Sequence, residues 1–250
     1  MRRVLGVLVC AGLAGALAQD ITLDRILKAN EDALGGAEAI ARVQTLKMTA
    51  RIIGAGGRVG APMITWTKRP NFVRSESEIQ GGRVIAGFDG TTAWIINSPT
   101  GSSAPEIMDA QTDSGLADAN IDTAIGSLAS LKAAGAAVEL LGKEDFGGSS
   151  VYRLQVTRKS GMVALYLVDA ATYLPVKTIT KGFRQGLETE VEAFPGDYKK
   201  AGNILFARSL EQRIGGRTIG RLTYEKIEIN EPMDDSLFKM PGTAAPAVKK

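Results

Sequence analysis

Residues 71–97 read NFVRSESEIQGGRVIAGFDGTTAWIIN. Three short runs in this stretch, 71–80, 83–88 and 92–97, contain β-branched and aromatic residues. Two glycine-containing dipeptides separate these runs, Gly81-Gly82 and Asp89-Gly90. A pair of residues of this type between two such runs is a strong signal for a β-hairpin. The stretch therefore predicts three consecutive antiparallel strands joined by tight turns.

The same pattern continues on both sides. Leu46, Met48 and Ala50 alternate with polar residues in a run that begins at Val43, as expected for a half-buried strand. Further strands are expected at 61–68, 137–146, 149–158, 162–169, 174–182, 187–195, 204–214 and 217–229. Two of their connections contain Gly147-Gly148 and Gly215-Gly216. About a dozen strands linked by short turns predict one large antiparallel meander and not a parallel sheet.

Helical patterns occur in three places. Thr22 can cap a helix that ends at Gly35-Gly36, and a second short helix is expected at 37–42. Asp118 can cap a third helix. The apolar side of that helix would consist of Ile121, Ile125, Leu128 and Leu131. Residues 98–117 are expected to form a long loop between the two series of strands.

The sheet should be curved and only partly covered. Its strands are apolar on one face and polar on the other, and three short helices cover only part of the apolar face. A curved sheet of this kind leaves a concave apolar cavity. We therefore expect a mainly β fold with a few helices on the concave face. Residues 19–240 would form a single domain, and 241–250 have the composition of a disordered tail.

The N-terminus has the order of a secretory signal. A basic pair, Arg2-Arg3, precedes an apolar run that ends in the small-residue motif Ala16-Leu17-Ala18. A membrane anchor is the alternative, but the run is shorter than the roughly 20 residues that span a bilayer. We therefore expect residues 1–18 to be removed by cleavage before Gln19. The mature protein would be periplasmic and would have no integral membrane segment.

The residue types that the expected mature chain lacks exclude several classes of catalytic and metal site. The chain has no histidine, and its one cysteine, Cys10, lies in the segment expected to be removed. Ser-His-Asp and Cys-His catalysis and cysteine or histidine metal sites therefore lack the residues that form them. Loss of Arg2 and Arg3 takes the basic residues from 30 to 28 against 27 acidic ones, which leaves no basic field for nucleic acid. We expect no catalytic residues, no metal and no cofactor.

Two patterns have both a functional and a structural interpretation. Glu188, Glu190 and Glu192 alternate along one strand and can bind a hard cation or form an acid/base pair, although a solvated strand face is the interpretation that we favour. Residues 54–60 nearly match a dinucleotide-binding fingerprint. They lie between two strands, where no helix N-terminus is available for phosphate, so a hairpin is the better interpretation.

Large apolar side chains on the strands are either core or the walls of a pocket for acyl chains. Most residues of this kind are core, and the pattern alone does not separate the two roles. The residues that we consider as cavity candidates are Met48, Ile52, Trp66, Phe72, Trp94, Leu154, Leu165, Leu167, Val191, Phe206 and Leu222.

Several motifs occur in a recognisable order. They are residues 68–74 (KRPNFVR), 87–96 (GFDGTTAWII), 151–154 (VYRL) and 166–177 (YLVDAATYLPVK). This ordered set resembles the outer-membrane lipoprotein-sorting (LolA/LolB-like) superfamily, and the similarity extends over about 23–240.

The resemblance implies a half-barrel of about eleven strands that is closed by helices and holds acyl chains in an apolar cavity. Carriers of this superfamily shuttle lipidated proteins across the periplasm, and other members bind lipids or serve as sensors. In the carriers an arginine on an early strand holds a helical lid shut, and Arg74 has the matching sequence context. A solvated arginine on an outer face is the alternative interpretation of Arg74.

Three functional hypotheses follow. The first is a periplasmic carrier that binds the acyl chains of lipids or lipoproteins, with an inner- or outer-membrane protein as a further partner. The second is a non-enzymatic envelope scaffold or sensor that recognises a protein partner through an edge strand or a loop. The third, an enzyme, is disfavoured by the missing catalytic residue types.

Overall fold

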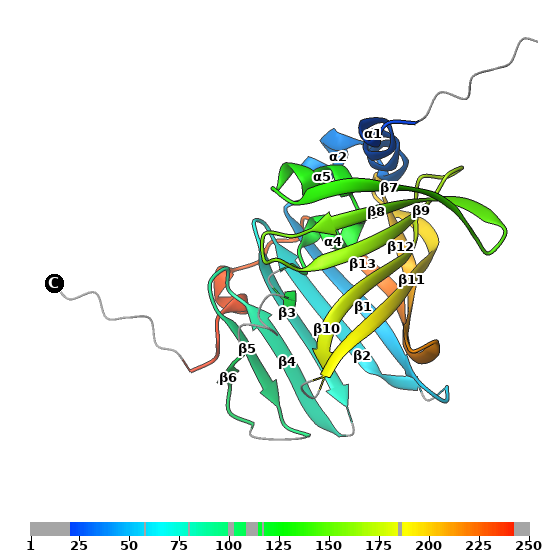
Figure 1. Ribbon diagram of the computed structural model, residues 1–250. Coiled ribbons are helices and arrows are strands. Elements are labelled where there is room, and N and C mark those ends of the chain that lie inside the picture. The colour runs from blue at the N-terminus through cyan, green and yellow to red at the C-terminus, as the bar shows by residue number, and fades with distance from the viewer. Residues whose placement is uncertain are drawn as a thin grey trace, which may run out of the picture.

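The computed structural model describes residues 21–57, 59–79, 81–99, 103–108, 115–116, 118–184 and 187–242. The expected signal segment with its cleavage site before Gln19 lies outside these residues, and so does the tail from position 243 onward. The described part is one antiparallel sheet of thirteen strands with short helices on its concave side (Figure 1).

The strands follow the predicted meander closely. Their bounds are β1 Thr45–Gly54, β2 Val59–Lys68, β3 Phe72–Ile79, β4 Gly82–Phe88, β5 Ala93–Asn97, β6 Glu106–Ile107, β7 Ala137–Phe146, β8 Ser149–Thr157, β9 Val163–Asp169, β10 Pro175–Arg184, β11 Leu187–Ala201, β12 Ile204–Ile214 and β13 Arg217–Ile229. The prediction of a mainly β fold with a large curved antiparallel sheet is confirmed. Two differences are the short strand β6, inside the expected loop, and β11, which is longer than expected.

Strand order explains how one sheet contains both series. Neighbouring strands are consecutive in the chain, except that β1 pairs with β13. Leu46 lies opposite Ile229 in this pairing, which joins β1–β6 to β7–β13. The sheet is not closed into a barrel, so β6 and β7 are its two edges. Edge strand β7 is irregular, because its register with β8 shifts between Leu140 and Gly142.

The helices pack against the concave face as two groups. Their bounds are α1 Leu23–Leu34, α2 Ala37–Ala41, α4 Ile121–Ile125 and α5 Leu128–Ala133. One core cluster joins α1 and α5 to β7–β9, with Ile26 and Leu128 fully buried. A second cluster joins α1, α2 and α4 to β1 and β12 through Ile125 and Phe206. None of the helices in the described ranges has both the length and the apolar composition that a membrane span needs.

The third predicted helix is two helices, which corrects the prediction that Asp118 caps a single one. Asn120 caps α4 by accepting a hydrogen bond from the Thr123 N–H at 3.0 Å. Gly126 then adopts a left-handed conformation (φ 84°) that ends α4, and Ser127 caps α5. All four apolar positions expected on this segment are buried, so the expected apolar face is present although the backbone turns between its halves.

The C-terminal segment returns over the convex face of the sheet. After β13 the chain reaches a short 3-10 helix, η1 Asp235–Phe238, which is red in Figure 1 and lies beside the strands β3–β5. Phe238 is fully buried and its ring lies 5.4 Å from the ring of Phe72. This segment therefore covers part of the face that a half-barrel would expose to solvent.

Candidate functional site

A cavity of about 500 Å³ lies between the concave face of the sheet and helix α4. Strands β1, β2 and β9–β13 form its wall, and α4 with the loop residues before it forms its roof. Side chains alternate between the two faces of a strand, so Thr65 and Thr67 line the cavity while Trp66 faces the convex side. The volume falls within the range of about 300–1,000 Å³ typical of small-molecule sites.

The wall of the cavity is apolar with a set of hydroxyl groups. Thr65 and Thr67 on β2 and Thr178 and Thr180 on β10 lie among apolar side chains. Met48, Ala164, Leu210 and Phe206 are examples of those apolar neighbours. Among the described residues, the buried Thr67 hydroxyl has no hydrogen-bond partner. A buried hydroxyl without a partner is unfavourable, so this group lowers the stability of the wall in which it lies.

Two tyrosines in the wall are half-buried and have a raised pKa. Burial raises the pKa of Tyr198 and of Tyr224 above the usual value, because the phenolate form loses its solvation. The Tyr198 hydroxyl donates to the Pro175 carbonyl oxygen at 2.7 Å. These groups therefore contribute polarity to the wall but no negative charge.

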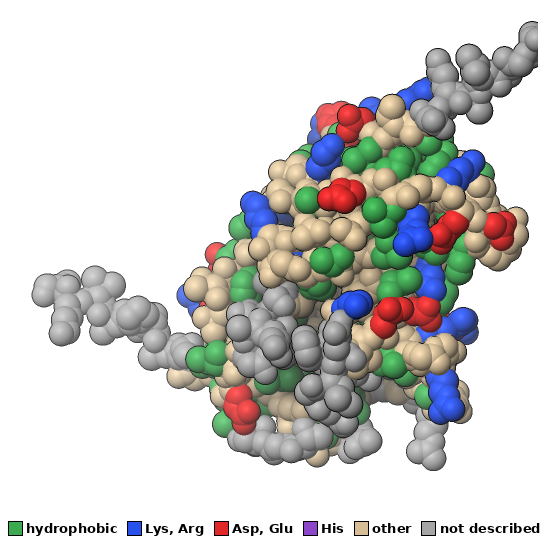
Figure 2. All heavy atoms as spheres, viewed as in Figure 1, with side chains coloured by type: hydrophobic (Ala, Val, Ile, Leu, Met, Phe, Trp, Pro, Cys, Tyr) green, Lys and Arg blue, Asp and Glu red, His purple; other side chains and the backbone are tan. Residues whose placement is uncertain are grey.

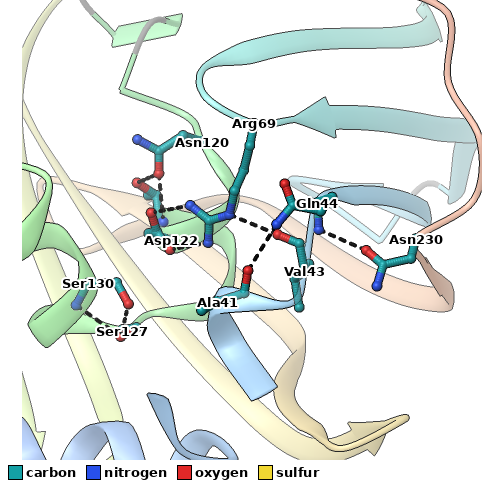
Figure 3. A network of polar contacts seen from close by, with 10 residues as sticks. Ala41, Val43, Gln44, Arg69, Asn120, Asp122, Ser127, Ser130 and Asn230 are labelled. Atoms are coloured by element: carbon teal, nitrogen blue, oxygen red, sulfur yellow. Dashed lines mark hydrogen bonds and ion pairs between the residues drawn. The ribbon is translucent and has the colours of Figure 1, made fainter. Parts of the chain in front are cut away.

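An ion pair holds the roof of the cavity in place (Figure 3). Arg69, in the β2–β3 turn, donates from Nη1 and Nη2 to the two carboxylate oxygens of Asp122 in α4, at 2.9 and 2.7 Å. Its Nε donates to the Val43 carbonyl oxygen at 2.8 Å. Asp122 is almost fully buried, and a bidentate geometry of this kind is specific as well as strong. The pair ties the roof to the sheet.

The expected lid arginine, Arg74, lies on the other side of the sheet. Its Nη1 donates to the Leu237 carbonyl oxygen at 2.9 Å, and its Nε donates to Glu76 at 2.8 Å. The guanidinium lies over the ring of Trp94, 5.4 Å from the ring centre. Arg74 therefore fastens the C-terminal segment, and it is Arg69 that contacts a helix over the cavity. Nothing local in the sequence marks Arg69, because Asp122 is 53 positions away.

The cavity candidates divide into four groups. Met48 and Phe206 line the cavity itself. Val191 and Leu222 are each two residues from a lining residue on the same strand, and Ile52 pairs with Leu222 beside them.

The third and fourth groups lie away from the wall. The third group is on β8 and β9. Leu154 of β8 is in the core cluster under α1 and α5, and Leu165 and Leu167 of β9 alternate with the lining residues Ala164 and Tyr166. The fourth group consists of Trp66, Phe72 and Trp94, which face the C-terminal segment. There the Trp94 ring donates from Nε1 to the Phe238 carbonyl oxygen at 2.8 Å.

The acidic strand has an ordinary ion-pair partner. Glu192 pairs with Lys177 of β10, and Glu190 is exposed. Groups of three or more acidic residues close enough to hold a metal ion do not occur in the part of the chain that the structure describes. Acidic and basic side chains are interspersed over the face seen in Figure 2, without a patch of one sign.

Comparison with known proteins relates the chain to a fold. Neither a protein-family profile nor the sequence of a curated protein matches it. The LolA superfamily protein NE2245 from Nitrosomonas europaea is similar in structure, with a TM-score of 0.58 at 13% identity over 88% of this chain and 98% of that one.

Two further solved structures resemble the chain to a similar degree. A DUF1329 family protein from Desulfovibrio piger has a TM-score of 0.57 at 12% identity over 86% of this chain and 96% of that one. A putative outer membrane lipoprotein-sorting protein domain from Vibrio parahaemolyticus has a TM-score of 0.53 at 13% identity over 85% of this chain and 95% of that one. With its open antiparallel sheet around short helices, the chain has a LolA-like fold.

Proposed function

We propose that the protein is a periplasmic carrier that holds the acyl chains of a lipid or a lipoprotein in the cavity under α4. The observation that carries the proposal is the apolar cavity itself, on the concave face of a LolA-like sheet. Each methylene group moved from water into such a site contributes about 0.8 kcal/mol, so a chain of ordinary length binds through burial alone. The role is one of binding and transport, without catalysis.

Release of the cargo would require movement of the roof. Helix α4 has five residues, so its position depends on packing and on the ion pair between Arg69 and Asp122. Breaking this pair would let α4 move away from the sheet and open the cavity. A membrane protein partner is the agent that we propose for this step in the cell.

Export is the remaining part of the proposal. Residues 1–18 would direct the chain to the periplasm and be removed, so that the mature N-terminus is Gln19. N-terminal sequencing of the protein recovered from a bacterial periplasm tests this step. A chain that retains Met1 and stays in the cytoplasm would exclude the periplasmic role.

The binding step is tested by identifying what the protein carries. We would purify the chain from the periplasm and analyse it by native mass spectrometry, then by extraction into organic solvent. The expected result is a bound lipid or acylated peptide at one copy per chain. Ala193→Phe, which places a ring in the cavity, should abolish it.

Glu190→Phe is the matched control, because position 190 is exposed on the same strand. It should leave the cargo in place. A folded protein that is empty in every preparation, and that gains no thermal stability from added lipid, would overturn the proposal. That result would favour a scaffold or sensor that recognises a protein partner.

A further inference from the structure

Arg158 places a positive charge at the cavity. It follows β8 at the turn into β9, where its N–H donates to the Met162 carbonyl oxygen at 2.8 Å. Both Arg158 and Met162 line the cavity. From the guanidinium, Nη2 donates to the hydroxyl oxygen of Tyr166, another lining residue, at 3.3 Å. The residue is half-buried, and the bond to Tyr166 holds its guanidinium against the wall of the cavity.

Arg158 shares the lack of a carboxylate partner with half-buried Arg208 on β12, whose Nη2 donates to the Lys200 carbonyl oxygen at 3.4 Å, but Arg208 is not among the residues that line the cavity. The other half-buried arginines in the described ranges differ from both. Arg69, Arg74 and Arg213 each pair with a carboxylate on a neighbouring element or strand position. Within the residues that the structure describes, Arg158 forms no ion pair. The Tyr166 oxygen takes up one of its five N–H donors, and a guanidinium in a partly dry site is unfavourable without an anionic acceptor.

The other charged lining group does not satisfy this arginine. Asp118, in the loop before α4, accepts a hydrogen bond from the Ser160 hydroxyl at 2.5 Å. No ion pair joins Asp118 to Arg158 among the described residues. The cavity therefore combines a long apolar wall with one cation whose donors remain available.

We infer that the ligand of this cavity is an anionic amphiphile, whose carboxylate or phosphate head binds Arg158 while its acyl chain lies along the apolar wall. The inference rests on the proposed function, because it specifies the ligand of the same cavity. A guanidinium matches both head groups through two parallel N–H donors, which gives them preference over neutral heads.

The test uses one chain length and three heads. N-phenyl-1-naphthylamine, an uncharged fluorophore, would first be titrated into the full chain to report the apolar cavity. Decanoate, decyl phosphate and 1-decanol would then be compared as competitors, below their aggregation concentrations. The expected result is displacement by decanoate or decyl phosphate at concentrations roughly ten-fold or more below that of decanol, as for a charge-assisted hydrogen bond.

Arg158→Gln should remove this preference. We expect decanoate and decyl phosphate to weaken roughly ten-fold while decanol and the fluorophore keep their affinities. Arg153→Gln is the matched control, because Arg153 is exposed on β8, the strand that leads to Arg158, and pairs with Glu144 outside the cavity lining. Thermal unfolding of both variants checks that they fold. If only one of the two anions shows the preference, that head identifies the source as a fatty acid or as a phospholipid.

The outcomes separate this inference from the proposed function. Equal displacement by the three compounds, unchanged in Arg158→Gln, would overturn the anionic head while leaving the acyl-chain cavity intact. A folded protein that binds neither the fluorophore nor any of the three compounds would overturn the carrier proposal itself. Stronger binding of decanol than of the anions would overturn the inference and favour a neutral acylated cargo.

Discussion

Thr67 combines a buried position with an unsatisfied hydroxyl. Its side chain lies in the cavity wall, and none of the described residues bonds its oxygen. Thr67→Val keeps the shape and removes the unsatisfied group, so the free energy of unfolding should rise by about 1 kcal/mol. Urea denaturation measures this change. Thr178→Val, in the same wall, is the comparison, and a loss of stability in Thr67→Val would show that the hydroxyl has a partner in the folded protein.

Gly87 is required by the ring that lies over it. A Cβ atom at this position would be 2.4 Å from carbon atoms of the Trp94 ring, which is fully buried. Gly87→Ala should therefore destabilise the protein by about 1–3 kcal/mol, since the ring cannot move without losing its bond to Phe238. Gly220→Ala is the control, because its Cβ would meet only the Ile53 carbonyl oxygen at 3.6 Å. Equal effects of the two variants would contradict this packing.

Among the contacts that hold single helices and strands in place, the ion pair between Arg69 and Asp122 of α4 is expected to have the largest effect on stability. Asp122→Asn leaves Arg69 without its anionic partner. The cost should be about 2 kcal/mol, less than for a fully buried pair, because the Arg69 side chain is 26% exposed. Amide hydrogen exchange of 121–125 should accelerate more than that of α1. The double variant Arg69→Gln/Asp122→Asn should cost less than the sum of the two single changes.

An exposed pair provides the contrast. Arg83 and Glu76 form an ion pair with the Arg83 side chain 67% exposed, so Arg83→Gln should change stability by less than about 1 kcal/mol. A similar loss in Arg83→Gln and Asp122→Asn would show that α4 does not depend on its ion pair.

Strands β12 and β13 share a pH-sensitive contact. Hydrogen bonds from Arg221, Arg213 and Thr218 lower the pKa of Glu211 to about 2, from the usual value of 4.5. The folded protein holds this proton less tightly than the unfolded chain does. The stability from this contact is therefore complete above pH 4.5 and is lost as the pH falls toward 2.

Glu211→Gln should flatten the pH dependence of stability in that interval. Thermal unfolding measured from pH 5 to pH 2.5 checks it, with the exposed Glu190→Gln as the control. The wild-type protein and the control should lose stability more steeply than Glu211→Gln. Parallel curves for all three proteins would exclude the contact as the cause.

At the scale of the whole molecule, the sequence predicts those features of the fold that depend only on residues close together in the chain. The hairpins at Gly81-Gly82 and Gly147-Gly148 follow from local turn chemistry, and the strand alternation places Met48 on the concave face. The break at Gly126 had a local signal as well, a glycine followed by the capping residue Ser127.

Contacts between segments that are distant in the chain cannot be predicted from the local sequence pattern. A strand period of two does not say which face of the sheet is the concave one when both faces are covered, so the sequence pattern alone does not place Trp94. The C-terminal segment supplies that cover through Phe238. The role of Arg69 has no local sequence signal for a related reason, because it exists only after folding brings Asp122 to the guanidinium.

The open sheet also determines how the protein behaves at high concentration. Unpaired backbone groups at a sheet edge are templates on which further chains can add and grow into fibrils. Here one edge, β6, has only two residues, and the other, β7, is interrupted at Leu141 and contains Lys143 and Glu144 beyond the irregularity. Resistance to self-association therefore rests on a few edge residues. Removing Leu141 would give β7 a regular register and turn that edge into a surface for polymerisation.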